Sequence, residues 1–179
     1  MKPADLLVEI GTEELPPKAL RGLMDAFAAN LGSEIDEARL EHGELHAYAS
    51  PRRLAVIIEA LAAGQQDRRL SQKGPPVSVA YDDDGKPLPP ATAFAKKCGV
   101  DVAELGRVET EKVAWLVAET VEKGLTTAEL LTALIEKSLA DLPIPRRMRW
   151  GDGEAEFVRP VHWIMLLHGA DVIEGSVMG

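Results

Sequence analysis

The sequence is poor in cysteine and in aromatic residues. Its 179 residues include one cysteine, Cys98, so the chain can form neither an internal disulfide nor a zinc site built from several cysteines. Only 4% of the residues are aromatic, so a core drawn from the 46% that are hydrophobic must consist mainly of Leu, Val, Ile and Ala. Scarce cysteine suits a reducing compartment, and we expect a cytoplasmic location.

Long apolar runs are missing as well. The N-terminus, MKPADLLVEIG, lacks the charged start and the sustained apolar core of a signal peptide. The apolar stretch 163–167 is far shorter than the roughly 20 residues that a helix needs to cross a bilayer. We therefore expect a soluble protein that has no membrane partner.

Positive charge is in the minority. The 20 Lys and Arg residues are outnumbered by 29 Asp and Glu residues, which gives a formal net charge of -9. A general nucleic-acid coat needs a net basic surface, so the composition argues against that class of protein. The composition is still compatible with a local basic patch on an otherwise acidic protein.

The residues that are present predict a mixture of helices and strands. Apolar and β-branched runs predict strands at 6–10, 44–50, 54–61 and 113–121, with 54–61 in a central position because it is apolar on both faces. An apolar stripe from Leu20 to Ile35 predicts a helix that begins at the prolines 16–17. Three further elements are expected: a short helix at 92–97, a capping-box helix from Thr126 to about Asp141, and a closing hairpin of 161–169 with 172–177.

These elements predict an α+β (mixed α/β) fold, in which a mainly antiparallel or mixed sheet packs with about three to four helices. Residues 64–90 change character: they are polar and basic, then rich in turn formers, and Asp84-Gly85 predicts a hairpin turn. The sequence is compatible with two lobes. Residues 1–75 and 142–179 would form one strand-rich body, and 76–141 would form the second lobe.

Most motifs that identify a reaction are missing. There is no GxxxxGK[ST] phosphate loop, no GxGxxG after a strand and no HExxH. His42 and His46 lie in a turn and strand context, where four residues span roughly 13 Å, too far for one metal ion. Cys98 is best explained as a small apolar residue at a helix end, although nearby lysines could lower a thiol pKa. We predict no catalytic residue and no metal ligand.

The stretch LLVEIGTEELPP places two adjacent carboxylates, Glu13 and Glu14, between a strand and a helix. Adjacent residues of an extended chain point to opposite faces, so a hydrolase built on these carboxylates is the weakest alternative. Acidic groups just before a helix favour its positive N-terminal end. If the strand at 54–61 lies beside the strand at 6–10, we expect Glu13 or Glu14 to form a structural ion pair with Arg52 or Arg53.

Basic clusters are the remaining candidates for chemistry. Arginines beside an aromatic ring can hold phosphates and stack on bases. The first candidates for contact with phosphate groups or RNA are Arg146, Arg147, Arg149 and Trp150, and the second candidates are Arg52, Arg53 and Lys73. The alternative is that these cations pair with the many acids of the chain and have a structural role only.

Five stretches taken together resemble one family, the bacterial glycyl-tRNA synthetase β subunit. They are LLVEIGTEELPPKAL (6–20), SPRRLAV (50–56), QKGPP (72–76), LPIPRRMRWG (142–151) and FVRPVHWIMLL (157–167). They occur in that family's order, and the resemblance covers essentially the whole chain. It implies an N-terminal fragment of the β subunit, without the later helical and anticodon-binding domains.

The resemblance implies more than the residues do. The family's enzyme is an α2β2 tetramer that joins glycine to tRNA(Gly) with ATP and magnesium, and its α subunit forms the glycyl-adenylate. We expect the chain to support tRNA binding and subunit assembly, to bind no cofactor itself and to be inactive alone. Its partners would be the α subunit, tRNA(Gly) and the remaining β-subunit domains. The alternative is a purely structural assembly module that does not touch tRNA.

Overall fold

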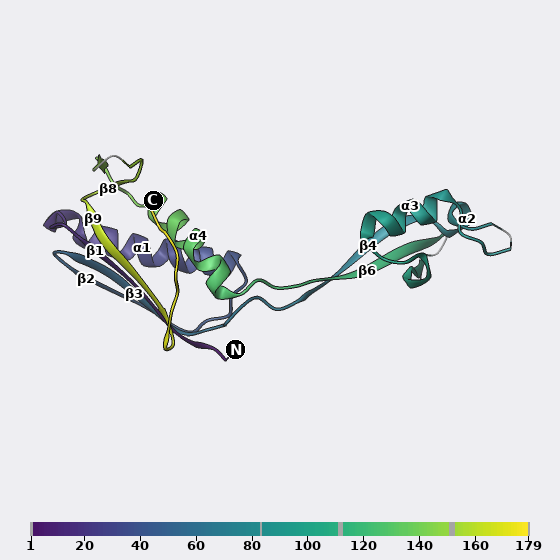
Figure 1. The fold of residues 1–179 in the computed structure, drawn as a ribbon, viewed down its shortest axis with the longest axis horizontal. Helices are drawn as coiled ribbons and strands as arrows, with labels where there is room; N and C mark the ends of the chain where they lie inside the picture. The colour runs from purple at the N-terminus through teal and green to yellow at the C-terminus, as the bar shows by residue number, and fades with distance from the viewer. Residues whose placement is uncertain (1, 83, 111–112, 151–152, 179) are drawn as a thin grey trace. The chain divides into compact units, whose positions relative to one another are not determined.

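The computed structural model describes residues 2–82, 84–110, 113–150 and 153–178 and divides the chain into two compact units (Figure 1). The first unit consists of residues 1–65 and 125–179, and the second consists of 66–124. The chain leaves and re-enters the first unit at one place, where the Gln65 amide donates to the Leu125 carbonyl at 2.9 Å. This pair of connections is called the neck below.

The described residues contain four α-helices and ten strands, and every ladder is antiparallel. The predicted α+β class is therefore confirmed. The boundaries of the two units differ from those of the expected lobes, which lay after residues 75 and 141. The helix at 127–140 packs within the first unit, and the strand at 68–76 pairs within the second, so both boundaries lie earlier in the chain.

A five-stranded sheet is the centre of the first unit, in the order β10–β9–β1–β3–β2. Its strands are β1 (Ala4–Thr12), β2 (Leu45–Ser50), β3 (Arg53–Leu61), β9 (Val161–His168) and β10 (Asp171–Val172). Strand β3 lies between β1 and β2, which confirms its predicted interior position. The predicted closing hairpin is also present as β9 and β10, although its second strand is short.

Two helices cover one face of this sheet (Figure 1). They are α1 (Pro17–Glu37), which begins at the predicted proline pair, and α4 (Thr127–Ala140), which begins at the predicted capping box. Alternate residues of β1 and β3 point toward them and are fully buried: Leu6, Val8, Ile10, Leu54, Val56 and Ile58. The helices contribute Leu23, Phe27, Leu31, Ile35, Leu131, Ile135 and Leu139 to the same core. Burial of this apolar surface is the main force that holds the unit together.

An ion pair joins the two helices at the edge of their contact. The ammonium of Lys137 on α4 lies 2.7 Å from Glu34 and 3.4 Å from Glu37, both on α1. The Glu34 carboxylate beside it raises the pKa of Lys137, and Glu37 adds to the effect. Because the Glu34 side chain is only 11% exposed, Lys137 also compensates a nearly buried carboxylate.

The opposite face of the five-stranded sheet is called the open face below, because no helix of this unit's described residues covers it. Four large side chains on it are exposed: Tyr48 (54%), Trp163 (40%), Met165 (44%) and Val172 (69%). Antiparallel register places Tyr48 opposite Ala55 and Trp163 opposite Gly11, on the face away from the helices. The first unit therefore has one packed face and one bare face.

The second unit is a small sheet with short helices. Its strands β4 (Arg68–Pro76), β6 (Ala114–Glu122) and β5 (Gly106–Glu109) pair in that order, and its helical elements are α2 (Val77–Ala80), α3 (Pro89–Cys98) and a 3₁₀ turn at Val102–Glu104. Helix α3 ends at Gly99, whose φ of 71° is the left-handed conformation that glycine favours at the C-terminal end of a helix. The largest contact cluster of buried residues in this unit joins Ala80, Ala91 and Leu116, with Phe94 and Tyr81 packed against it.

Two segments differ from their sequence-based predictions. Residues 68–76 lie in the polar and basic stretch for which no strand was predicted, but they form β4. Pairing with β6 satisfies their backbone, although most of their side chains face solvent. Residues 77–80 were expected to lead into a hairpin, but they form one helical turn directly after Pro76. Asp84 and Gly85 do form a turn, which is closed by a bridge between Tyr81 and Pro87.

Candidate nucleic-acid interface

Three segments that are distant in the sequence meet just after β1. The Thr12 amide donates to the Arg52 carbonyl at 2.9 Å, and the Leu15 amide donates to the Pro51 carbonyl at 2.6 Å. Between them, the amide of Glu13 donates to the Pro160 carbonyl at 2.9 Å. The stretches GTEELPP, SPRR and FVRP therefore form one corner at the end of the sheet, which is called the β1 corner below.

The two adjacent acidic residues at this corner, Glu13 and Glu14, make different contacts. Oε1 of Glu13 lies 3.0 Å from Nε2 of His162 on β9, so this contact links the corner to the neighbouring strand. Glu14 contributes its backbone instead, because its carbonyl accepts a hydrogen bond of 3.1 Å from Nε of Arg159. Glu13 and Glu14 therefore do not face a common site at which both carboxylates could act on one substrate.

The arginine expected to pair with Glu13 or Glu14 has another partner. Arg53 lies 3.0 Å from Oε1 of Glu9, and no ion pair joins Arg52 or Arg53 to Glu13 or Glu14 among the residues that the structure describes. The cause is the register of β1 and β3. Arg53 stands opposite Gly11, so the nearest carboxylate on the same face belongs to Glu9, two residues back along β1.

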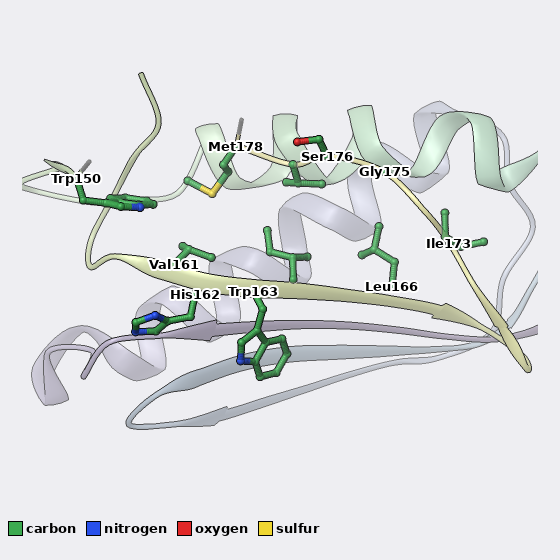
Figure 2. Close-up of a pocket in the computed structure, with 11 residues that line it drawn as sticks. Trp150, Val161, His162, Trp163, Leu166, Ile173, Gly175, Ser176 and Met178 are labelled. Atoms are coloured by element: carbon green, nitrogen blue, oxygen red, sulfur yellow. The ribbon is translucent and has the colours of Figure 1, made fainter. Parts of the chain in front are cut away.

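Arg53 also contacts an aromatic ring. Its guanidinium carbon lies 5.7 Å from the centroid of the Trp163 indole, within range of a cation–π interaction. The indole extends from β9 away from the helices (Figure 2). It lies across Gly11 of β1, where an added Cβ would stand 2.3 Å from the ring. Glycine at this position leaves the space in which the indole lies against the strand.

The arginines just before residue 150 lie around a two-stranded hairpin, β7 (Met148–Arg149) with β8 (Glu156–Phe157). Arg147 donates to the Ala140 carbonyl at the end of α4, so its guanidinium helps to cap that helix. Arg149 pairs with Glu154 at 3.4 Å. Arg146 is exposed, and its side chain has no hydrogen bond or ion pair with any described residue.

Trp150, the aromatic candidate of this cluster, is turned inward. It is half-buried, packs against the main core and lines a cavity of about 280 Å³ between β9 and the segment 173–178 (Figure 2). Val161, Ile164 and Met178 line the same cavity. The position of Trp150 favours a packing role for its ring.

Arg159 connects the hairpin to the β1 corner. Its Nε donates to the Glu14 carbonyl, and its Nη1 donates to the sulfur of Met148 at 3.4 Å. The exposed Arg52 follows directly on Pro51, which is bonded to Leu15 at the same corner. Arg52, Arg146, Arg149 and Arg159 therefore belong to one end of the first unit.

Lys73, the remaining candidate, lies on β4 in the second unit. Its ammonium stands 3.9 Å from the centroid of the Trp115 ring on β6. The adjacent Gly74 is as close to an aromatic side chain as Gly11 is, because an added Cβ would stand 2.5 Å from Phe94. Each unit therefore presents one cation against one tryptophan on a sheet.

Four residues of this region were not among the sequence candidates: Tyr48, Arg159, His162 and Trp163. The useful signal was period-two alternation in β9 and β2, which places Trp163 and Tyr48 on the bare side of their strands. His162 and Arg159 could not be found in this way, because their partners depend on the fold of the corner.

No three metal-ligating side chains come together within the described ranges. The sulfur of Cys98 donates weakly to Gln72 at 3.3 Å, and His42 and His46 each contact a carboxylate, Asp36 and Glu59. None of the helices in the described part of the chain combines the length and apolar character that a membrane span requires.

Comparison with known proteins identifies close relatives. Residues 6–179 match the family model described as glycyl-tRNA synthetase beta subunit. The chain is 52% identical over 178 residues to the glycine–tRNA ligase beta subunit of Marinobacter nauticus, covering 99% of this chain and 26% of that protein. It is 50% identical over 173 residues to the proteins of the same name from Serratia proteamaculans and Yersinia pestis, covering 97% of this chain and 25% of each of them. The chain thus spans about a quarter of the length of the curated relatives it matches.

Proposed function

The chain belongs to the glycyl-tRNA synthetase beta subunit family, and on this premise we propose that it serves in the β subunit of a tetrameric glycine–tRNA ligase. In that enzyme it supports tRNA binding and subunit assembly. Glycyl-adenylate forms in the α subunit, which uses ATP and magnesium, and this chain binds neither. Its partners are the α subunit, tRNA(Gly) and the other domains of the β subunit.

The observation that carries this proposal is the group of arginines at the β1 corner and the adjoining hairpin. Arg52 and Arg146 are exposed and lack side-chain partners among the described residues. Arg149 has only Glu154, whose side chain is 94% exposed. Exposed ion pairs contribute about 0–1 kcal/mol, so a phosphate group can replace Glu154 at little cost.

The test is the salt dependence of tRNA(Gly) binding by the complete ligase. Each phosphate contact that is lost lowers the slope of log K against log salt by about one unit. We expect Arg52→Ala and Arg146→Ala each to weaken binding and to lower the slope by about this amount. Arg147 is left unchanged, since its contact with Ala140 makes it part of the fold.

Arg21→Ala is the matched control for these variants. Arg21 lies on α1, its side chain is 91% exposed, and its contact with Asp25 is long at 3.8 Å. The Arg21→Ala substitution removes one positive charge from a different surface, so it should leave the slope of log K against log salt unchanged. Equal slopes for Arg52→Ala, Arg146→Ala and the wild type would contradict the proposed tRNA contacts.

A second candidate function, a purely structural assembly module, is favoured by the open face. One half of the open face, called the aliphatic half below, carries the exposed Met165 and Val172 beside Leu7, Ile57 and Leu167. Bare apolar surface of this kind is typical of protein interfaces. In this role the face would pack against the α subunit or against another β-subunit domain.

Lysine substitutions test the assembly role directly. Burying an ammonium without a partner is costly, so Met165→Lys and Val172→Lys should dissociate the tetramer if the aliphatic half is an interface. Val121→Lys on β6 is the matched control, because Val121 is 61% exposed and lies in the second unit. Mass photometry at nanomolar concentration gives the subunit composition, and intact tetramers in all three variants would exclude this interface.

A further inference from the structure

The end of the open face nearest the β1 corner differs from the aliphatic half. Across three neighbouring strands it carries Trp163 on β9, Gly11 on β1 and Arg53 on β3, which stand side by side in the sheet register. Tyr48 follows on β2, opposite Ala55. Aromatic rings and a guanidinium thus form a strip across the sheet, which is called the aromatic strip below.

The strip is preorganised at its tryptophan. The indole fills the space above Gly11, is 40% exposed and has Arg53 beside it. Arg53 is itself held by the 3.0 Å ion pair with Glu9. A ring that is fixed in place loses little conformational freedom when a flat ligand stacks on it, which favours binding.

A hollow of about 350 Å³ lies on the other strands of the strip and shares Arg53 with the tryptophan contact. Its lining residues are Glu9, Tyr48, Ala49, Ser50, Arg53 and Ala55. The volume is at the lower end of the range for small-molecule sites, about 300–1,000 Å³. The lining combines one aromatic ring with a hydroxyl, a guanidinium and a carboxylate.

We propose that the aromatic strip binds an unpaired nucleotide of RNA, with its base stacked on Tyr48 in the hollow. Stacking on aromatic rings beside arginine is the usual way in which proteins hold single-stranded RNA. Arg52, exposed at the rim, meets the adjoining phosphate. The inference rests on the proposed tRNA function and deepens it, because it assigns a base contact where that function needs only phosphate contacts.

The carboxylate in the hollow adds a preference among bases. Oε1 of Glu9 is engaged by Arg53, which leaves Oε2 to accept a hydrogen bond. Adenine, guanine and cytosine carry an exocyclic amino group that can donate to it, whereas uracil carries none. The strip therefore favours amino-bearing bases over uracil.

The experiment measures binding of labelled single-stranded RNA octamers, oligo(A) and oligo(U), to the intact 179-residue chain. Tyr48→Leu keeps an apolar side chain but removes the aromatic ring, and Tyr48→Phe keeps the ring. Stacking is worth roughly fivefold to a hundredfold in affinity per base. We expect Tyr48→Leu to weaken oligo(A) binding by this amount at an unchanged salt slope, and Tyr48→Phe to bind within about twofold of the wild type.

Two further measurements check the geometry. An RNA duplex with the same number of phosphates should bind more weakly than oligo(A), since its bases are not available for stacking. In a Trp115→Phe/Trp150→Phe background, saturating oligo(A) should quench the fluorescence of Trp163. Equal melting temperatures of the Tyr48 variants verify their fold, which is expected because Tyr48 is 54% exposed.

Each contrary outcome has one meaning. Equal binding by Tyr48→Leu and Tyr48→Phe, or no RNA binding at low salt, overturns the stacking site and leaves the strip as apolar assembly surface. If Arg52→Ala lowers the salt slope while Tyr48→Leu has no effect, the phosphate contacts stand and the base contact fails. If Tyr48→Leu weakens binding while Arg52→Ala and Arg146→Ala leave the slope intact, the stacking site stands and the arginine assignment fails.

Discussion

At the scale of single residues, Gly11 determines the shape of the open face. It stands opposite both Trp163 and Arg53, and the indole occupies the space that any side chain at this position would need. The cation–π contact between Arg53 and Trp163 depends on this arrangement. Glycine is required here for close approach of a ring, not for an unusual backbone angle.

The first prediction concerns Gly11→Ala. The new methyl group must displace the Trp163 ring, and overpacking of this kind typically costs about 1–3 kcal/mol. We expect a loss of stability in that range and a shift of tryptophan emission toward that of a solvated indole. Urea unfolding followed by fluorescence measures both effects.

Gly22→Ala is the control for this substitution. Gly22 lies in α1 and an added Cβ there meets nothing within 4 Å, so alanine should stabilise the helix by about 0.5–1 kcal/mol. Unchanged stability and emission in Gly11→Ala would mean that the indole does not need this space.

The sequence indicated candidate residues more readily than it indicated the partners with which they interact. Arg53 was selected from its neighbours in SPRR, but its contacts with Glu9 and Trp163 follow from strand register and span 44 and 110 positions of the chain. The ion pair expected between Arg53 and Glu13 or Glu14 rested on the assumption that β1 and β3 are neighbours. The two strands are neighbours, but the ion pair does not form. Glu9 and Glu13 lie two residues to either side of Gly11, the residue opposite Arg53, and the arginine pairs with Glu9.

At the scale of elements, α4 shows what local sequence signals can establish. The predicted capping box is present: Thr126 accepts from the Glu129 amide, and the Glu129 carboxylate accepts from the amide and the hydroxyl of Thr126. The side-chain hydrogen bond from Thr126, followed by the bond from its backbone amide, lowers the pKa of Glu129. The helix start was predictable because its signals lie within four residues.

The second prediction follows from this lowered pKa. A carboxyl group whose pKa is lower in the folded protein contributes stability above its unfolded value, near 4.5, and loses that contribution as the pH falls through the folded value. Glu129→Gln keeps an acceptor at this position but removes the charge. We expect it to be less stable than the wild type at pH 7, and we expect the difference to vanish in acid below pH 4.5.

Thermal unfolding at pH 7 and at acidic pH measures this difference. Thr126→Ala removes the other half of the capping box and should cost about 0.5–2 kcal/mol at neutral pH. A stability gap between Glu129→Gln and wild type that persisted unchanged into acid would show that the charge is not responsible.

Strand β4 shows where local signals fail. Its sequence, RRLSQKGPP, has neither apolar alternation nor β-branched residues, so it resembles a loop. It becomes a strand because β6 offers a complete ladder of partners from Arg68–Glu122 to Lys73–Val117. Tertiary pairing overrides weak local propensity at this element, and no pattern within residues 68–76 could have indicated it.

At the scale of the whole molecule, the two units differ greatly in core size. Within the described residues, the main core contains twenty buried apolar residues from Leu6 to Leu166. The second unit buries only six, four of them alanines: Ala80, Ala91, Ala95, Leu116, Val117 and Ala118. Stability against local opening rises with buried apolar contact. The first unit should therefore be the more stable of the two.

The third prediction is that the first unit folds without the second. Gln65 and Leu125 are hydrogen-bonded at the neck, so a linker of roughly three Gly and Ser residues can replace 66–124 without strain. We expect the shortened chain to melt within a few degrees of the main transition of the intact chain. Circular dichroism gives the melting curve.

Hydrogen exchange on the intact chain supplies an independent check. Amides of β1 and β3 should be the most protected, and those of β4 and β6 should exchange sooner. A shortened chain that fails to fold, or equal protection in both units, would show that the second unit stabilises the first.

The neck also determines how the second unit responds to mechanical tension. Its entry and exit strands are antiparallel partners that begin beside each other, with Arg68 opposite Glu122. A pull transmitted through residues 65 and 125 draws both strands apart from the same end, so the load falls on one hydrogen-bonded pair at a time. The folded first unit holds Gln65 and Leu125 together through their hydrogen bond, so it protects this ladder from such a load. The strands separate in sequence from Arg68 toward Lys73 only after the first unit has opened at the neck.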